Sequence, residues 1–228
     1  MAQSDKGYYA FDPLTHTWQP YKQVVPFGKQ PKLYEDARYL VYADCQGEFG
    51  GTAYFYNKQT RQTHRVGATC ANSVWQENGQ YRLLVSLGHM MGGAGASTIH
   101  DPELLPLTAS SATAVKSAEV AATAKNILPL FDFYGLQLFG GLRYQNQTLF
   151  LMHWRSTTFL VTIAGQHIII VDPSFANNLY THNPVTTSYG PELALTNLDF
   201  YGLGGSDEVA SLLWQGQQLT KIEWGEQP

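Results

Sequence analysis

The sequence predicts an all-β fold, a β-propeller of four or five blades that spans residues 1–228 as one domain. Three observations predict it. A short pattern ending in Asp or Asn recurs along the chain, a strand–turn–strand element recurs beside it, and one pentapeptide occurs twice. The composition fits, because 44% hydrophobic and 13% aromatic residues supply enough apolar material for one buried core.

The recurring pattern has two or three apolar or aromatic residues followed by Asp or Asn, often with Pro next. Its copies are Tyr9–Pro13, Tyr54–Lys58, Thr98–Pro102 and Ile169–Pro173. The spacings between their Asp or Asn residues are 45, 44 and 71 residues. The first two spacings indicate a unit of about 45 residues, and the third indicates the same unit with an insertion.

An aromatic residue and a polar turn precede a run of strand-forming residues four times. The four elements begin at Tyr34, Trp75, Tyr144 and Trp214. Asn-Gly, Gly-Gln and Asn-Gln between such runs are hairpin signals, so each element predicts strand, turn and strand. The pentapeptide Asp132–Leu136 recurs as Asp199–Leu203, which indicates a longer repeated unit in the second half of the chain.

Units of about 45 residues with four short antiparallel strands are typical of propeller blades. One such sheet cannot bury both of its faces, whereas several sheets stacked around an axis can. The first strand, Gly7–Asp12, has no partner before it, and the last run, Leu219–Trp224, has no strand after it. We therefore expect the two terminal strands to share one blade, which would hide two edges. A β-sandwich of meander hairpins is the alternative.

The segment Thr108–Lys125 interrupts the repeats. It is rich in Ala, Ser and Thr and contains neither an aromatic residue nor a glycine. Ala favours a helix while Ser and Thr weaken one, so the segment predicts a helical or flexible insertion on the surface of the propeller.

The segment Tyr9–Trp18 resembles the final two strands of a kelch repeat, with a Tyr-rich strand, Asp-Pro-x-Thr and a Trp in the next strand. Gly50-Gly51 similarly resembles the kelch double glycine. The resemblance ends soon after, because Thr63–Arg65 stands where a Trp is expected and no double glycine directly precedes Ile169. It implies a kelch-like propeller and no particular partner or activity.

The charge pattern argues against nucleic-acid binding. The chain has 14 Lys and Arg against 18 Asp and Glu, a formal net charge of -4, and no basic run longer than two residues. The most apolar stretch, Ile127–Gly141, is broken by Pro129 and Asp132, so we expect no membrane insertion.

Cys45 and Cys70 fit either one disulfide or two free buried thiols.

The chain start and the composition suggest export. Met1–Asp5 resembles an initiator Met placed on a mature end left by signal-peptide cleavage. A surface rich in Gln, Thr, Asn and Tyr is typical of secreted proteins and carbohydrate binders. We therefore expect a secreted or periplasmic protein in its mature form.

The motifs of common enzymes are missing from the sequence, including G-x-S-x-G, H-E-x-x-H, the P-loop and Cys-x-x-Cys. We expect a non-enzymatic, monomeric binding scaffold without a cofactor or a metal, which recognises a glycan or protein partner through loops at one face of the propeller. The alternative is a carbohydrate-active hydrolase or lyase that uses Asp and Glu residues at the channel mouth.

The candidate ligand-binding residues are Glu48, His89, His153 and Trp154. Glu48 and His89 each stand 14 residues after the leading aromatic residue of their repeat, and His153 stands 9 residues after its own. Equivalent positions on successive blades lie around one ring, so these side chains are expected to converge at one end of the channel. Trp154 adds a ring that can stack on a sugar. Alternatively, they are exposed turn residues.

Two aspartates are secondary candidates. Asp132 and Asp199 begin the two identical pentapeptides and are expected to occupy equivalent sites. Paired carboxylates facing each other across a cleft would suit glycoside hydrolysis. Alternatively, each caps a turn by accepting hydrogen bonds from its own backbone.

Overall fold

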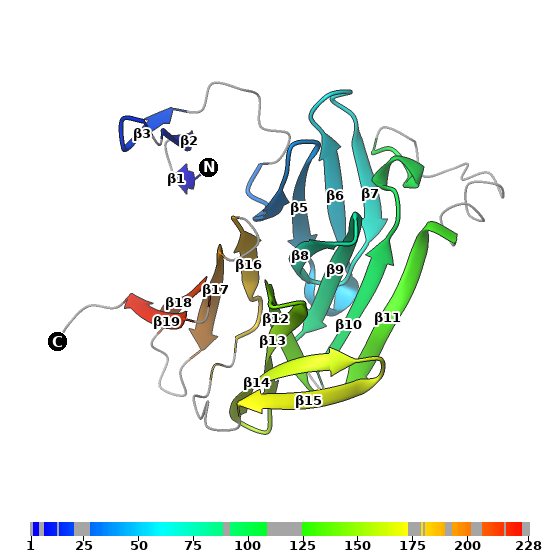
Figure 1. Ribbon diagram of the computed structural model, residues 1–228, viewed down its shortest axis with the longest axis vertical. Coiled ribbons are helices and arrows are strands. Elements are labelled where there is room, and N and C mark those ends of the chain that lie inside the picture. Colours follow the sequence, from blue (N-terminus) through cyan, green and yellow to red (C-terminus); the bar gives the residue numbers. More distant parts are fainter. Residues whose placement is uncertain are drawn as a thin grey trace.

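The computed structural model describes residues 2–4, 7–12, 14–20, 28–88, 92–108, 125–172, 179, 181–189, 193–201, 207–216 and 218–224. Strands dominate these residues, and four four-stranded antiparallel sheets are arranged as a four-bladed β-propeller (Figure 1). The predicted all-β propeller is confirmed with four blades, and the β-sandwich alternative is excluded.

Each blade is one meander, and the blades follow one another along the chain. Blade 1 contains β4 (Lys32–Glu35), β5 (Tyr39–Cys45), β6 (Gly51–Asn57) and β7 (Thr63–Gly67). Blade 2 contains β8 (Ala71–Glu77), β9 (Gln80–Leu87), β10 (Gly93–Ile99) and β11 (Ile127–Tyr134). Blade 3 contains β12 (Gln137–Tyr144), β13 (Gln147–Trp154), β14 (Thr157–Ala164) and β15 (His167–Asp172). Blade 4 contains β16 (Val185–Ser188), β17 (Leu193–Tyr201), β18 (Asp207–Gln215) and β19 (Gln218–Trp224).

The first strand of each blade lies at the centre of the propeller. Among β4, β8, β12 and β16, each strand contacts the next, and β16 contacts β4, so the ring closes. β8 and β16 also contact each other across the middle. The ring is therefore narrow at its axis.

The predicted hairpins follow from turn chemistry. Asn78 and Gly79, between β8 and β9, have φ of 52° and 75°, and Gln145 and Asn146, between β12 and β13, have φ of 44° and 68°. Two successive left-handed residues are typical of a type I′ turn, whose twist matches that of the flanking strands. The element at Trp214 is also a hairpin, but it joins the third and outer strands of blade 4.

Apolar side chains fill three of the four blade interfaces. Separate buried clusters join blades 1 and 2, blades 2 and 3, and blades 3 and 4. Between blades 4 and 1 the described contacts come from the inner strands: the Thr187 hydroxyl donates to the Lys32 carbonyl at 2.6 Å, and the Lys32 ammonium lies 5.4 Å from the Tyr189 ring centroid. Val185 of β16 also packs against the apolar cluster of blades 1 and 2.

Gly140 and Gly141 fit β12 between two tryptophans. Both residues have positive φ, 95° and 100°, at a bulge in the ladder with β13. A Cβ on Gly141 would lie 2.8 Å from the Ser73 hydroxyl and 3.2 Å from the Trp75 ring, and one on Gly140 would lie 3.3 Å from the Trp214 ring. Only glycine combines this backbone conformation with so close an approach.

The expectation that the two terminal strands share a blade is wrong. β2 (Gly7–Asp12) pairs with β1 (Ala2–Ser4) and β3 (Thr17–Pro20) in a separate three-stranded sheet, and β19 pairs with β18 (Figure 1). The reason is that β16–β19 already supply four consecutive strands of blade 4, which leaves no strand position there for the N-terminal segment.

The predicted insertion at 108–125 falls mostly on residues 109–124, which lie outside the described residues. Its flanks show that the chain leaves blade 2 after β10 and returns as β11. In between, η2 (Pro102–Leu104) and the residues after it run along blade 1: the Arg65 amide donates to the Pro106 carbonyl, and the Thr108 amide donates to the Thr63 carbonyl. The described part of this excursion therefore covers the outer edge of β7.

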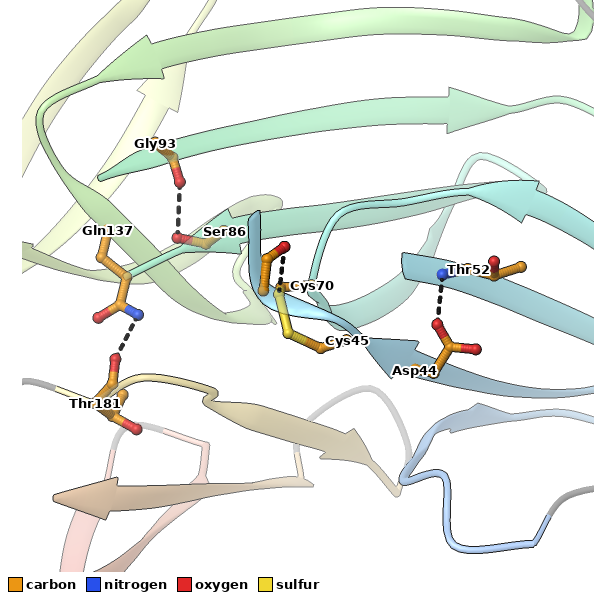
Figure 2. Close-up of a disulfide and its surroundings, with 9 residues drawn as sticks. Asp44, Cys45, Thr52, Cys70, Ser86, Gly93, Gln137 and Thr181 are labelled. Carbon is orange, nitrogen blue, oxygen red and sulfur yellow. Dashed lines mark hydrogen bonds between the residues drawn. A yellow bond between two sulfur atoms is a disulfide. The ribbon is translucent and has the colours of Figure 1, made fainter. Parts of the chain in front are cut away.

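Cys45 and Cys70 form a disulfide, so the alternative of two free thiols is excluded. The bond links the end of β5 to the connection before β8 and thereby ties blade 1 to blade 2 (Figure 2).

In the part of the chain that the structure describes, no helix is long and apolar enough to span a membrane.

Candidate binding face

The propeller has two ends, which we name by the connections they carry. At the hairpin end, the turns 36–38, 78–79 and 145–146 join the first and second strands of blades 1 to 3, and β16 of blade 4 ends there too. At the entry end, the inner strands begin and the second strands lead into the third strands. The ligand-binding candidates that the structure describes lie at the entry end, and the three cavities described below lie at the hairpin end.

Glu48, His153 and Trp154 lie at the entry end, Glu48 on blade 1 and the other two on blade 3. Glu48 is exposed in η1 (Gly47–Phe49), and His153 and Trp154 end β13, which is the second strand of its blade and not the innermost one. His89 lies outside the described residues. The structure therefore brings three of the candidates to one end, and the convergence of all four stays a prediction.

Trp154 and His153 each interact with a neighbouring side chain. The Arg155 guanidinium lies 4.6 Å from the Trp154 ring centroid and covers one face of the ring. The His153 Nδ1 lies 3.4 Å from the Thr158 hydroxyl, and burial lowers the pKa of His153. A neutral imidazole and a covered indole are poorer ligand groups than an open histidine–carboxylate cluster.

Buried polar side chains fill the axis at the entry end. Gln137 begins β12, is 3% exposed, and donates to the carbonyl of the fully buried Thr181 at 2.7 Å. A Cβ on Gly88 would lie 2.7 Å from the same amide nitrogen. Nearby, the Ser86 hydroxyl donates to the Gly93 carbonyl at 3.2 Å (Figure 2). These contacts tie the start of β12 to the segment around Thr181 at this end.

The two aspartates do not occupy equivalent sites. Asp132 is exposed on β11, the outer strand of blade 2, whereas Asp199 belongs to β17, the second strand of blade 4. The repeated pentapeptide therefore reflects a similar local sequence on different strands. Among the described residues, no group of three or more His, Cys, Asp or Glu side chains could hold a metal ion.

The hairpin end is hollowed at the axis. A cavity of about 230 Å³ opens where all four inner strands end. Each inner strand contributes to its lining, which consists of Tyr34, Glu35, Trp75, Gln76, Gly141, Leu142, Arg143 and Ser188. The bulge at Gly141 therefore shapes this cavity as well as the packing around it.

Two further cavities flank the axial one at the same end. The first, of about 380 Å³, lies between blades 2 and 3 and is lined by residues that include Trp75, Phe150 and Gln147. The second, of about 490 Å³, lies between blades 3 and 4 and includes Tyr144, Gln147 and Trp214. Trp75 borders both the axial cavity and the first, and Gln147 borders both lateral ones. The three cavities together form one surface, which we call the hairpin face.

The charged groups of the hairpin face are paired with one another. The Glu35 carboxylate accepts hydrogen bonds from Lys32 at 3.0 Å and from Lys58 at 2.8 Å. Burial acts to raise the pKa of Glu35, but the two ammonium groups outweigh it and lower that pKa. Arg143 is paired with Glu77, which Arg82 also contacts at 3.4 Å. The face therefore presents amides, hydroxyls and aromatic rings beside neutralised charges.

Trp75 has a polar group without a partner. Its side chain is 5% exposed and packs edge-to-face on Phe150 at 5.6 Å, yet its indole N–H finds no hydrogen-bond acceptor among the residues that the structure describes. In contrast, the indole N–H of Trp214 donates to the Thr196 hydroxyl at 3.2 Å. A buried donor left unpaired costs free energy of folding.

The comparisons with known proteins identify no relative. No family model, curated protein or solved structure matches the chain. The kelch resemblance therefore stays a resemblance.

Proposed function

We propose that the protein is a non-enzymatic binding scaffold that holds a neutral glycan on the hairpin face. The observation that carries this proposal is the continuity of the three cavities through Trp75 and Gln147. A ligand made of linked rings could place successive units in adjacent cavities, whereas a compact ligand would use only one of them.

The sizes of the cavities favour such a modular ligand. Cavities that enclose a drug-sized molecule usually measure about 300–1,000 Å³. The axial cavity, at about 230 Å³, is smaller and suits a single ring, while the lateral ones, at about 380 and 490 Å³, have room for larger groups. One sugar unit at the axis and further units beside it would fill this arrangement.

The chemistry of the lining also favours a neutral sugar. Aromatic rings pack on the apolar faces of sugar rings, and amide side chains both donate and accept hydrogen bonds to hydroxyl groups. Gln76, Gln145 and Gln147 supply such amides, and the nearby carboxylates and cations are paired. A charged ligand would have to compete with these ion pairs.

The hydrolase alternative gains no support from the hairpin face. A glycosidase needs one carboxyl group that is held protonated to donate a proton to the leaving group. The pKa of Glu35 is lowered by Lys58 and Lys32 against the effect of burial, which is the opposite of what a general acid requires. The proposal is therefore binding without chemistry.

Export is part of the proposal. A disulfide persists in oxidising compartments such as the periplasm or the extracellular space, and Cys45–Cys70 is such a bond. Free glycans and cell-surface glycans are accessible ligands in these compartments.

The test is a glycan array with the purified protein, followed by titration calorimetry on the best neutral oligosaccharide. Gln147→Ala should weaken binding about tenfold, because one hydrogen bond of about 1 kcal/mol and its contacts are lost. Gln46→Ala is the matched control, since Gln46 is an exposed glutamine at the entry end. An array without any binder, or equal losses from both variants, would contradict the proposal.

A further inference from the structure

The axial cavity of the hairpin face is a blind hollow. Its lining comes from the hairpin ends of the four inner strands, β4, β8, β12 and β16. In each of these strands, the residue directly before the lining is buried. These four residues are Leu33, Val74, Gly140 and Thr187. The cavity is therefore closed toward the entry end and opens at the hairpin end.

Close contacts between the inner strands form the floor of this hollow. The Thr187 hydroxyl donates to the Lys32 carbonyl at 2.6 Å and joins β16 to β4 just below the cavity. On another side, β12 approaches β8 so closely that a Cβ on Gly141 would lie 2.8 Å from the Ser73 hydroxyl. Because the strands touch one another here and the residues are buried, a chain of sugar units cannot continue along the axis.

The three cavities form a row, and the axial cavity lies at one end of it. The axial cavity shares Trp75 with the cavity between blades 2 and 3, which in turn shares Gln147 with the cavity between blades 3 and 4. Among the described residues, the axial cavity and the cavity between blades 3 and 4 have no lining residue in common. A chain that follows this row therefore has its first or last unit at the axis.

We propose that the axial cavity receives the terminal unit at the non-reducing end of the glycan, so that the protein recognises the end of a chain and not its interior. This inference rests on the proposed function and adds which part of the glycan enters the axis. An internal unit is bonded to a neighbour on both sides and needs two exits from its site. A blind hollow at the end of a row provides one exit.

The lining of the axial cavity suits the extra hydroxyl group of a terminal unit. A terminal unit at the non-reducing end carries a hydroxyl where an internal unit carries the bond to its neighbour. Tyr34, Gln76 and Ser188 contribute neutral hydrogen-bonding groups to the lining from three different blades. A site that is built to bind a hydroxyl discriminates against a unit that lacks it, because the polar groups of the site are then left unpaired.

The non-reducing end is also the end that bound glycans present. A glycan on a protein, a lipid or a cell wall is linked through its reducing end, so its non-reducing units point away from the surface that carries it. A blind hollow that opens at one end of the propeller can receive such a unit without contacting the surface behind it.

A substitution tests the place of the terminal unit. Ser188→Phe puts a ring into the axial cavity and should weaken the binding of every chain at least about tenfold, because the ring takes the space of the terminal unit. Thr220→Phe is the matched control, since Thr220 is exposed on β19 of the same blade and is not part of the lining of the three cavities. It should bind like the unaltered protein, and equal affinities of the two variants would overturn the proposal.

Reduction of the sugar tests which end is bound. Borohydride opens the terminal ring at the reducing end of an oligosaccharide and leaves the non-reducing end unchanged. The reduced oligosaccharide should therefore bind as tightly as the untreated one. A loss of affinity of about tenfold or more would assign the axial cavity to the reducing end and overturn the proposal.

The decisive experiment uses the unaltered protein and needs no variant to fold. Linear glucans, mannans and xylans are titrated by calorimetry, each as a short oligosaccharide and as a soluble polymer of the same linkage. We expect one protein molecule per chain at both lengths, because every linear chain has one non-reducing end. Several protein molecules per polymer chain would overturn the proposal and leave the proposed function intact. Binding of none of these chains would contradict the proposed function, and the inference with it.

Discussion

Gly141 shows how one residue shapes both the core and the hairpin face. Its φ of 100° belongs to a region that side-chain-bearing residues avoid, and a Cβ there would lie 2.8 Å from the Ser73 hydroxyl. The double glycine is visible in the sequence. The two tryptophans that it accommodates, Trp75 of β8 and Trp214 of β18, belong to other blades. No local pattern reveals such a contact before the blades are packed.

Gly141→Ala should lower the free energy of unfolding by about 3 kcal/mol, from backbone strain and overpacking together. Gly165→Ala is the control, because Gly165 has a φ of 60° but open space around its Cβ position. It should cost only about 1 kcal/mol, from the strain alone. Urea unfolding of both variants measures the difference, and equal losses would show that the contact with blade 2 contributes nothing.

Among the elements, the hairpins were predictable and the pairing of the outer strands was not. Asn78-Gly79 and Gln145-Asn146 specify tight turns by their backbone preferences, which are local. The copy Ile169–Pro173 looks like the copies at Tyr54 and Thr98, yet it falls on an outer strand while theirs fall on or at the ends of third strands. A short apolar run ending in Asp does not tell the two positions apart, because β6 and β10 alternate between buried and half-buried residues whereas β15 has no buried residue.

The η2 excursion depends on Glu103, whose carboxylate joins blade 2 to blade 1. Glu103 accepts hydrogen bonds from the Tyr39 hydroxyl at 2.8 Å and from the Asn57 amide, and it lies 3.5 Å from the His64 ring. Partial burial acts to raise the pKa of Glu103, but these hydrogen bonds and the charges of His64 and Arg38 lower it overall. The ionised carboxylate therefore holds the excursion in place.

Glu103→Gln should reduce the free energy of unfolding at pH 7 by about 1 kcal/mol. Because the folded-state pKa of Glu103 lies below the unfolded value, its contribution is complete above the unfolded pKa, about 4.3, and is lost as the pH falls through the folded pKa. Thermal melts from neutral to acidic pH should therefore show the gap between the two proteins closing. Asp132→Asn, at an exposed position of β11, should follow the unaltered protein throughout. A gap that stays constant with pH would contradict this role.

For the whole molecule, the repeat spacing was sufficient to predict a propeller but not how the ring closes. Orphan strands at both ends of the sequence suggested a shared blade, whereas β16 closes the ring against β4 by itself. The sequence did not predict the position of the cavities either. Trp75 and Trp214 are buried at the starts of two predicted elements, but a cavity between blades depends on strands that are distant in sequence.

The central claim is that the hairpin face, and not the entry end, binds the ligand. Hydrogen exchange with and without the neutral oligosaccharide selected by the array tests this claim most directly, because it reports on both ends of the same molecule. We predict slower exchange in Trp75–Gly79 and Tyr144–Gln147, which border the three cavities. Slower exchange confined to the entry-end segments around Glu48 and Trp154 would contradict the claim.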